Sequence, residues 1–144
     1  MQRSPASPYA MGMRRLGPPP SADEIEAIAR STLAALPAPF ADSLGDIVLQ
    51  IEEFADDATL DGLGIDDPFE LSGLYEGVPL PDRSVSESGV LPERIRLFRR
   101  PIIDEWASRD ETLEHLVAHV LIHEVGHHFG LSDADMHALE DQVA

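Results

Sequence analysis

The sequence predicts an α+β fold, and two features of its 144 residues carry that prediction. Apolar residues that recur about every 3.6 positions predict helices near both ends of the chain. Between these segments, short apolar runs bounded by Pro and Gly predict the strands of a small mixed sheet. A chain of this length builds one hydrophobic core, so a functional site has to be assembled from a single set of layers.

The first helix is expected over about 22–36. Ser21 and Glu24 have the spacing of a capping box, and apolar residues follow at helical spacing. Residues 1–20 are rich in Pro, Ser, Gly and Arg, so we expect a flexible N-terminal tail there. The folded domain is therefore expected to span residues 21–144.

Three segments are candidates for the sheet. The apolar run 47–51 is too short for a helix and is expected to be a strand buried on both faces. The acidic, Gly-containing stretch 52–67 predicts a loop. A weak strand is expected within 73–80, where Pro79 restricts it to an edge or a turn. Apolar and polar residues alternate over 94–98, which predicts a half-buried strand.

Two further helices are expected in the C-terminal third of the chain. The first is long, opens with a capping box at Ser108 and runs to Gly130, a residue suited to the left-handed conformation that ends helices. The second is short: Ser132 with Asp135 predicts its cap, and Leu139 is its last expected residue.

The histidines indicate where the chemistry lies. All six fall between His115 and His137, and four of them are spaced four residues apart, namely His115, His119, His123 and His127. Because each step of four residues turns only about 40° around a helix, neighbours in this row can bind one metal ion. The chain has no cysteine, so its metal ligands must be histidines and carboxylates.

The sequence His123-Glu124-Val125-Gly126-His127 selects one pair from this row, because an acid directly follows its first histidine. Two imidazoles one turn apart can bind one Zn²⁺ ion, while the glutamate reaches the water beside it. Zinc lowers the pKa of that water toward about 7, and Glu124 then accepts the proton as a peptide carbonyl is attacked. We therefore predict His123 and His127 as zinc ligands and Glu124 as the catalytic base.

The segment from His123 to Asp133, His-Glu-Val-Gly-His-His-Phe-Gly-Leu-Ser-Asp, resembles the zincin metallopeptidases. It is most similar to a small bacterial zincin-like family of minimal, single-domain metallopeptidases, and the similarity extends over 21–144, including 73–77. The resemblance implies a zincin-like fold, in which a small mixed sheet packs against an N-terminal helix and a long active-site helix. It also implies that Asp133 is the third zinc ligand, brought in after the turn at Gly130.

The third ligand has alternatives. An acid in the first turn of a helix is favoured by the helix dipole, so Asp133 also has a purely structural explanation. Asp135 and Glu140 are the other candidates.

For several other residues a structural role is the first expectation. Core or hydrogen-bonding positions are expected for His115, His119, His128, Tyr75 and Met136, and a solvated strand face for Arg94, Arg96, Arg99 and Arg100. The functional alternatives are support of the metal by His119, stabilisation of an oxyanion by Tyr75, and uptake of a peptide along the arginine-bearing strand.

We expect a zinc-dependent peptidase that acts on peptides or proteins, with activity that is weak or highly selective because the large C-terminal subdomain of bigger zincins is missing. A non-catalytic zinc-binding module and a hydrolase of another amide or ester bond are the alternatives. Glu124 favours an enzyme, since a structural metal site needs no base. The net charge of −17 repels phosphate backbones, so nucleic acid is not an expected partner. Neither a membrane span nor a secretory signal is visible, and we expect a cytoplasmic protein.

Overall fold

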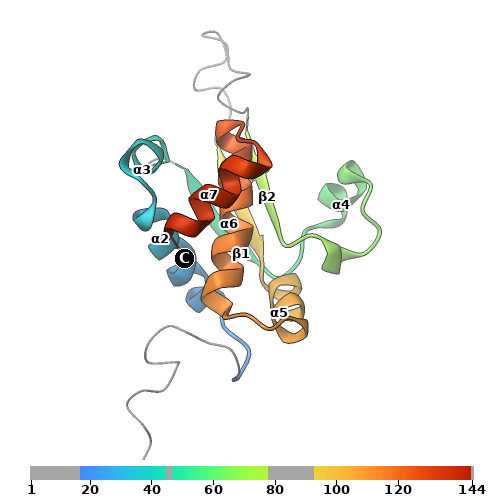
Figure 1. The fold of residues 1–144 in the computed structure, drawn as a ribbon. Coiled ribbons are helices and arrows are strands. Elements are labelled where there is room, and N and C mark those ends of the chain that lie inside the picture. The colour runs from blue at the N-terminus through green and yellow to red at the C-terminus, as the bar shows by residue number, and fades with distance from the viewer. Residues whose placement is uncertain (1–16, 45–46, 78–92, 144) are drawn as a thin grey trace, which may run out of the picture.

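The computed structural model describes residues 17–44, 47–77 and 93–143. Its elements, in chain order, are α2 (Ala22–Ala35), α3 (Ala38–Ser43), β1 (Val48–Glu52), α4 (Asp57–Leu63), the 3₁₀ helix η1 (Pro68–Glu70), β2 (Gly73–Glu76), β3 (Arg94–Phe98), α5 (Arg99–Ser108), α6 (Leu113–Phe129) and α7 (Asp133–Val143) (Figure 1). Most of the expected N-terminal tail and the end of the expected 73–80 strand lie outside the described residues. Among the described helices, none combines the length and the apolar character that a bilayer crossing requires.

The strands form one mixed sheet in the order β1-β3-β2. Strand β3 lies in the middle, parallel to β1 and antiparallel to β2, and Ile95 pairs with Leu49 on one side and with Tyr75 on the other. The α+β class and the small mixed sheet are therefore confirmed. Two strand expectations were wrong: β1 is an edge strand whose Val48 is 44% exposed, and β3 is buried on both faces, including Arg96.

Helices α2 and α6 cover one face of the sheet. Helix α2 contacts β1, α6 contacts β2 and β3, and the two helices contact each other. Figure 1 shows α6 running through the centre of the molecule with the strands behind it and α7 crossing in front. The shared core includes Ile25, Ala29, Leu49, Tyr75, Ile95, Leu97, Leu116, Val117, Leu121 and Val125. This arrangement confirms that the sheet packs against the N-terminal helix and the long histidine helix.

The opposite face of the sheet carries α4, which occupies part of the segment expected to be a loop. Leu60 of α4 packs with Phe98 of β3 in a second apolar cluster. The buried guanidinium of Arg96 lies beside this cluster, where its Nη2 is 2.8 Å from Glu52 Oε1 and 2.9 Å from Asp56 Oδ1. Hydrogen bonds from the Thr59 hydroxyl and from Arg96 hold the pKa of Asp56 well below its usual range. Arg96 therefore links α4 to the sheet, and the expected solvated strand face is wrong for this residue.

The predicted start of α2 is confirmed, whereas that of α6 is not. Both hydrogen bonds of the capping box form, from the Ser21 backbone to Glu24 Oε1 at 2.9 Å and from the Glu24 backbone to Ser21 Oγ at 3.1 Å. Residues 99–108 form α5, and α6 begins only after Thr112, whose hydroxyl accepts a hydrogen bond from the His115 backbone at 3.0 Å. Ser108 is thus the end of one helix and not the cap of the next.

The predicted turn after the histidine helix is confirmed. Gly130 ends α6 with a φ of 68°, the left-handed conformation that glycine adopts without steric cost. The Asp135 backbone donates to Ser132 Oγ at 3.1 Å, as the predicted cap requires, although α7 continues past Leu139 to Val143.

Helix α7 folds back onto α6 and packs against it at one close contact. Met136 is buried, which confirms its expected core position. A Cβ built on Gly126 would lie 2.1 Å from Met136 Sδ and 2.6 Å from its Cγ. Gly126 therefore allows α7 to approach α6 more closely than any other residue would.

A second glycine allows β2 to approach α6. A Cβ built on Gly73 would lie 2.8 Å from Val120 Cγ1 and 3.3 Å from both Glu124 Cγ and Leu97 Cδ2. Val120 and Leu97 are themselves buried, so they cannot swing away to make room.

Replacing Gly73 with Ala is expected to lower the free energy of unfolding by about 1–3 kcal/mol, because the added methyl overpacks the junction of β2 and α6. Urea denaturation of parent and variant measures this difference. Gly62→Ala is the matched control: Gly62 lies in α4 with nothing within 4 Å of a built Cβ, so that variant should gain about 0.4–1 kcal/mol. Equal effects of the two variants would contradict the proposed close contact.

Candidate active site and metal centre

Glu124 lies where α6 meets β2. The residue is only 8% exposed, and its Oε1 accepts a hydrogen bond of 2.7 Å from the backbone N–H of Tyr75. Backbone N–H groups in a strand point alternately to the two sides, and β2 pairs only with β3 among the described residues. The N–H of Tyr75 therefore points away from β3, and the carboxylate sits against the edge of β2 that faces away from β3.

The surroundings of Glu124 favour its protonated form more than water does. Burial raises the pKa of Glu124 above its ordinary value, while the neighbouring His127 and the hydrogen bond from Tyr75 act in the opposite direction. His127 Nδ1 lies 3.2 Å from the same Oε1. A carboxylate with a raised pKa accepts a proton more readily than a solvated one, which is the property required of a general base.

Tyr75 is held in place by two neighbours, the half-buried Glu93 and the buried His128. Its hydroxyl donates to Glu93 Oε2 at 2.7 Å and lies 3.2 Å from His128 Nδ1, and His128 also pairs with Glu93. This confirms structural roles for Tyr75 and His128. Because the hydroxyl of Tyr75 is engaged in the core, the contribution of this residue to the site is its backbone N–H, which orients Glu124.

The predicted ligands His123, His127 and Asp133 lie in the same region but in different surroundings. His123 is half-buried on α6, whereas the side chain of His127, one turn further along, is 59% exposed and faces Glu124. Asp133 is the first residue of α7 and is exposed. The three predicted ligands therefore come from two successive turns of α6 and from the start of the helix that follows it.

The pKa of His123 is lowered by its surroundings. Burial is the main cause, and the neighbouring His119 and, to a smaller extent, His127 act in the same direction. The carboxylates of Glu140 and Asp133 act in the opposite direction and raise it. The neutral imidazole that binds a metal is thus the favoured form of His123. Asp133 and His127 are both close enough for their charges to act on this residue.

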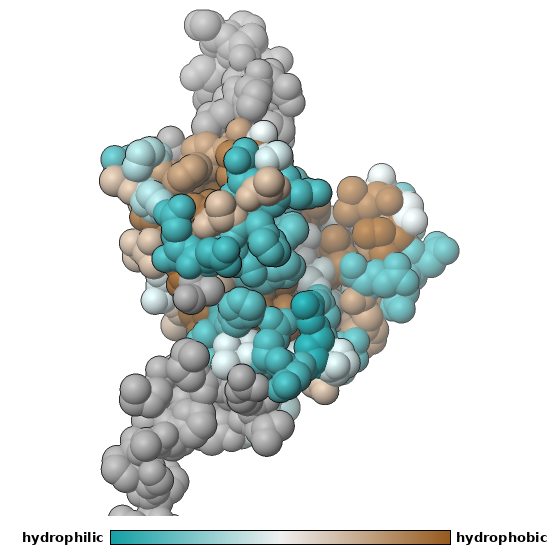
Figure 2. Space-filling model, viewed as in Figure 1, coloured by the Kyte–Doolittle hydropathy of each residue, from teal (hydrophilic) through white to brown (hydrophobic). Residues whose placement is uncertain are grey.

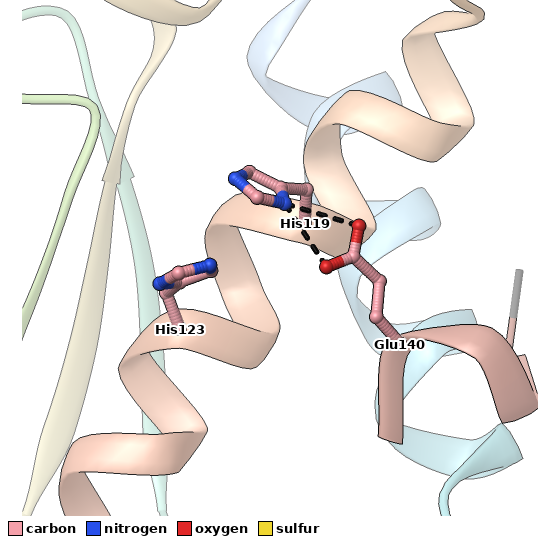
Figure 3. Close-up of side chains that lie close together, drawn as sticks. All are labelled: His119, His123 and Glu140. Carbon is pink, nitrogen blue, oxygen red and sulfur yellow. Dashed lines mark hydrogen bonds and ion pairs between the residues drawn. The ribbon is translucent and has the colours of Figure 1, made fainter. Parts of the chain in front are cut away.

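His119, His123 and Glu140 lie closer together than the predicted ligands do. One ligand atom from each of these three lies within 4.8 Å of the others, and His127 and Asp133 are not in this group (Figure 3). His119 Nδ1 is 3.0 Å from both carboxylate oxygens of Glu140. The sequence singled out each of these residues, but their grouping depends on how α7 folds back along α6, which no local pattern indicates.

The arginines of the 94–100 region are structural. Strand β3 is paired on both sides, so the functional alternative, in which it takes up a peptide by strand addition, was wrong. Arg94 pairs with Glu76 of β2, and Arg99 donates to the Pro20 carbonyl at 2.8 Å. Among the described strands, the one at the sheet edge beside the site is β2.

The residues of this region suit a zinc ion. Zinc in proteins prefers imidazole nitrogen and carboxylate oxygen when thiolates are absent. Helix α6 offers histidines on successive turns, α7 offers carboxylates at both of its ends, and the carboxylate of Glu124 is buried between α6 and β2. A single metal ion with a base beside it is the arrangement that hydrolytic zinc sites share.

Comparison with known proteins identifies the family. No curated protein matches the chain significantly. The sequence model described as zincin-like metallopeptidase matches residues 44–143, from the residue after α3 to the end of α7. The match begins later than the resemblance at 21–144 suggested, but it includes the whole sheet and every candidate ligand. Since it covers more than half of the chain, the protein belongs to the zincin-like metallopeptidase family.

Proposed function

We propose that this protein is a zinc-dependent peptidase in which His123, His127 and Asp133 hold the metal and Glu124 is the general base. Membership of the zincin-like family supports a metal-dependent hydrolase. The observation that carries the residue assignment is the position of Glu124, which is buried and fixed by the Tyr75 backbone beside the first predicted ligand.

Each residue has a separate task in this proposal. When bound, zinc supplies Lewis acidity, which makes a water molecule acidic enough to lose a proton near neutral pH. Glu124 accepts that proton and later returns it to the leaving nitrogen. The Tyr75 N–H keeps the carboxylate in one orientation, and His127, 3.2 Å from the same oxygen, favours its ionised form.

The edge of β2 supports a peptide as the substrate. The backbone groups of Gly73 that point away from β3 lie on the side where Glu124 accepts the hydrogen bond from the Tyr75 N–H. An extended peptide can pair with these groups of Gly73 and thereby pass its backbone in front of the base. This geometry favours a peptide over a small amide or ester, which has no backbone to pair.

Glu124→Gln is expected to lower kcat by about 10²–10⁴-fold while zinc remains bound, because the amide keeps the shape and the Tyr75 hydrogen bond but cannot accept a proton. Hydrolysis of a broad peptide library, together with metal analysis of each purified protein, measures both effects.

Glu70→Gln on η1 is the matched control, since Glu70 is an exposed glutamate in a different element. It should keep both zinc and turnover. Zinc in the parent protein with no cleavage of any peptide would contradict the peptidase and favour a non-catalytic zinc-binding module.

The raised pKa of Glu124 has a consequence for stability. In the metal-free protein the folded state binds the Glu124 proton more tightly than the unfolded state, so the stabilisation is complete below the unfolded pKa of about 4.3 and is lost as pH rises through the higher folded value. Metal-free Glu124→Gln should therefore be more stable than the parent at pH 7, and the difference should shrink toward pH 4. Urea denaturation at both pH values tests this, and a variant that is less stable at pH 7 would rule out a desolvated carboxylate.

Asp133→Asn is expected to weaken zinc binding by at least about 10-fold, because an amide is a poorer ligand than a carboxylate. Competition with a chromophoric chelator measures the affinity. The matched control is Asp135→Asn, which changes the next acid of the same helix turn. If only the control weakens binding, the third ligand is Asp135.

A further inference from the structure

We propose that His119, His123 and Glu140 form a second site for one divalent transition-metal ion of the zinc type. We call this set the outer register. It shares His123 with the proposed catalytic set of His123, His127 and Asp133, which we call the motif register. The chain would thus carry two overlapping metal positions one helical turn apart.

The geometry of the outer register comes from two helices. His119 and His123 lie on successive turns of α6, and their ring centroids are 4.4 Å apart. Glu140 reaches them from the last turns of α7, and one ligand atom from each residue lies within 4.8 Å of the other two. In Figure 3 a nitrogen of His123 faces the gap beside the His119–Glu140 pair. Two imidazoles and a carboxylate complete the protein side of a zinc site that keeps a fourth position open.

The burial of Glu140 makes it suited to a cation. This glutamate is only 7% exposed, and in the described part of the chain the basic groups within 4 Å of its carboxylate are the imidazoles of His119 at 3.0 Å and His115 at 3.8 Å. No arginine lies among these groups, and an imidazole carries an opposite charge only when it is protonated. A divalent ion between Glu140 and the two imidazoles would supply that charge.

The packing of α7 places an acid near each register. Met136, seated on Gly126, fixes the position of α7 along α6. Asp133 and Glu140 are seven residues apart, which is about two helical turns, so they lie on the same side of α7. Asp133 lies at the end of α7 nearest to His127, and Glu140 at the end that contacts His119.

The two registers exclude each other. A neutral imidazole has one nitrogen free to bind a metal, because the other carries the proton. His123 can therefore serve only one register at a time, and a metal ion in the outer register leaves the motif register without its first ligand. This consequence rests on the proposed function: metal in the outer register would stop hydrolysis.

The test separates the registers by removing ligands that they do not share. Zn²⁺ is titrated into the metal-free full chain in competition with a chromophoric chelator. His127→Asn removes a ligand of the motif register only, so this variant should still bind one zinc ion through the outer register. Adding Glu140→Gln, or alternatively His119→Asn, should then weaken binding by at least about 100-fold.

Matched controls keep the result interpretable. Two double variants serve as controls, and each adds one substitution to His127→Asn. The first adds Asp141→Asn, which changes the exposed acid next to Glu140, and the second adds His137→Asn, which removes an exposed histidine of α7. Both should bind zinc as the single variant does. Thermal unfolding of the metal-free proteins identifies any variant that fails to fold, in which case the other outer-register variant decides.

Two results would overturn the outer register. One is loss of zinc binding in His127→Asn alone, and the other is equal affinity in the single variant and in the Glu140→Gln double variant. In either case His119 and Glu140 form only a hydrogen bond between helices. Failure of the proposed function is detected separately, as an absence of Glu124-dependent turnover in the parent.

Discussion

The contact between Glu124 and the backbone of Tyr75 is the interaction on which the site depends. It requires α6 to lie directly against the edge of β2, and Gly73 makes this possible because no side chain stands between the two elements. Burial at this contact raises the pKa of the Glu124 carboxylate, while the hydrogen bond from the Tyr75 N–H lowers it and gives the buried group a partner. The reactivity and the position of Glu124 thus have a common origin in the packing of one strand on one helix.

The sequence predicted the elements whose signals are local. Ser21 with Glu24, Ser132 and Gly130 mark helix ends through hydrogen bonds or backbone conformations that lie within a few residues. The long apolar periodicity of α6 was sufficient to predict the helix and its end at Gly130, although its start was placed too early at Ser108 because Thr112 offers an equally good cap.

The sequence did not predict helices α4 and α5. Contacts with distant residues hold α4, and α5 contains a proline in its first turn. In α4 only Leu60 is buried, and the helix is held by packing against Phe98 and by Arg96, which comes from a strand far along the chain. In α5, Pro101 comes soon after the predicted strand 94–98 and gives no local sign of a helix, yet a proline in the first turn of a helix loses no hydrogen bond. A local sequence pattern shows neither the distant contacts of α4 nor the position of Pro101 within a helical turn.

The candidate site likewise contains residues that a local pattern predicts and residues that only tertiary packing brings together. The sequence alone was sufficient to place His123, Glu124 and His127 on one helix, because their spacing is a local property. It could not show that Glu140 reaches His119, since that contact joins residues 21 positions apart through the packing of α7. The family match adds the chemistry that zincin-like proteins share but does not say which acid of α7 faces which histidine.

The contact of Met136 with Gly126 fixes the position of α7 along α6. Gly126 is the one glycine within α6, so helix α7 cannot shift along α6 without bringing the Met136 side chain against a residue that carries a Cβ. The distances between the acids of one helix and the imidazoles of the other are consequently fixed by this single contact. A change in metal preference during evolution would then arise by exchanging the side chains at positions 133 or 140, with the backbone left where it is.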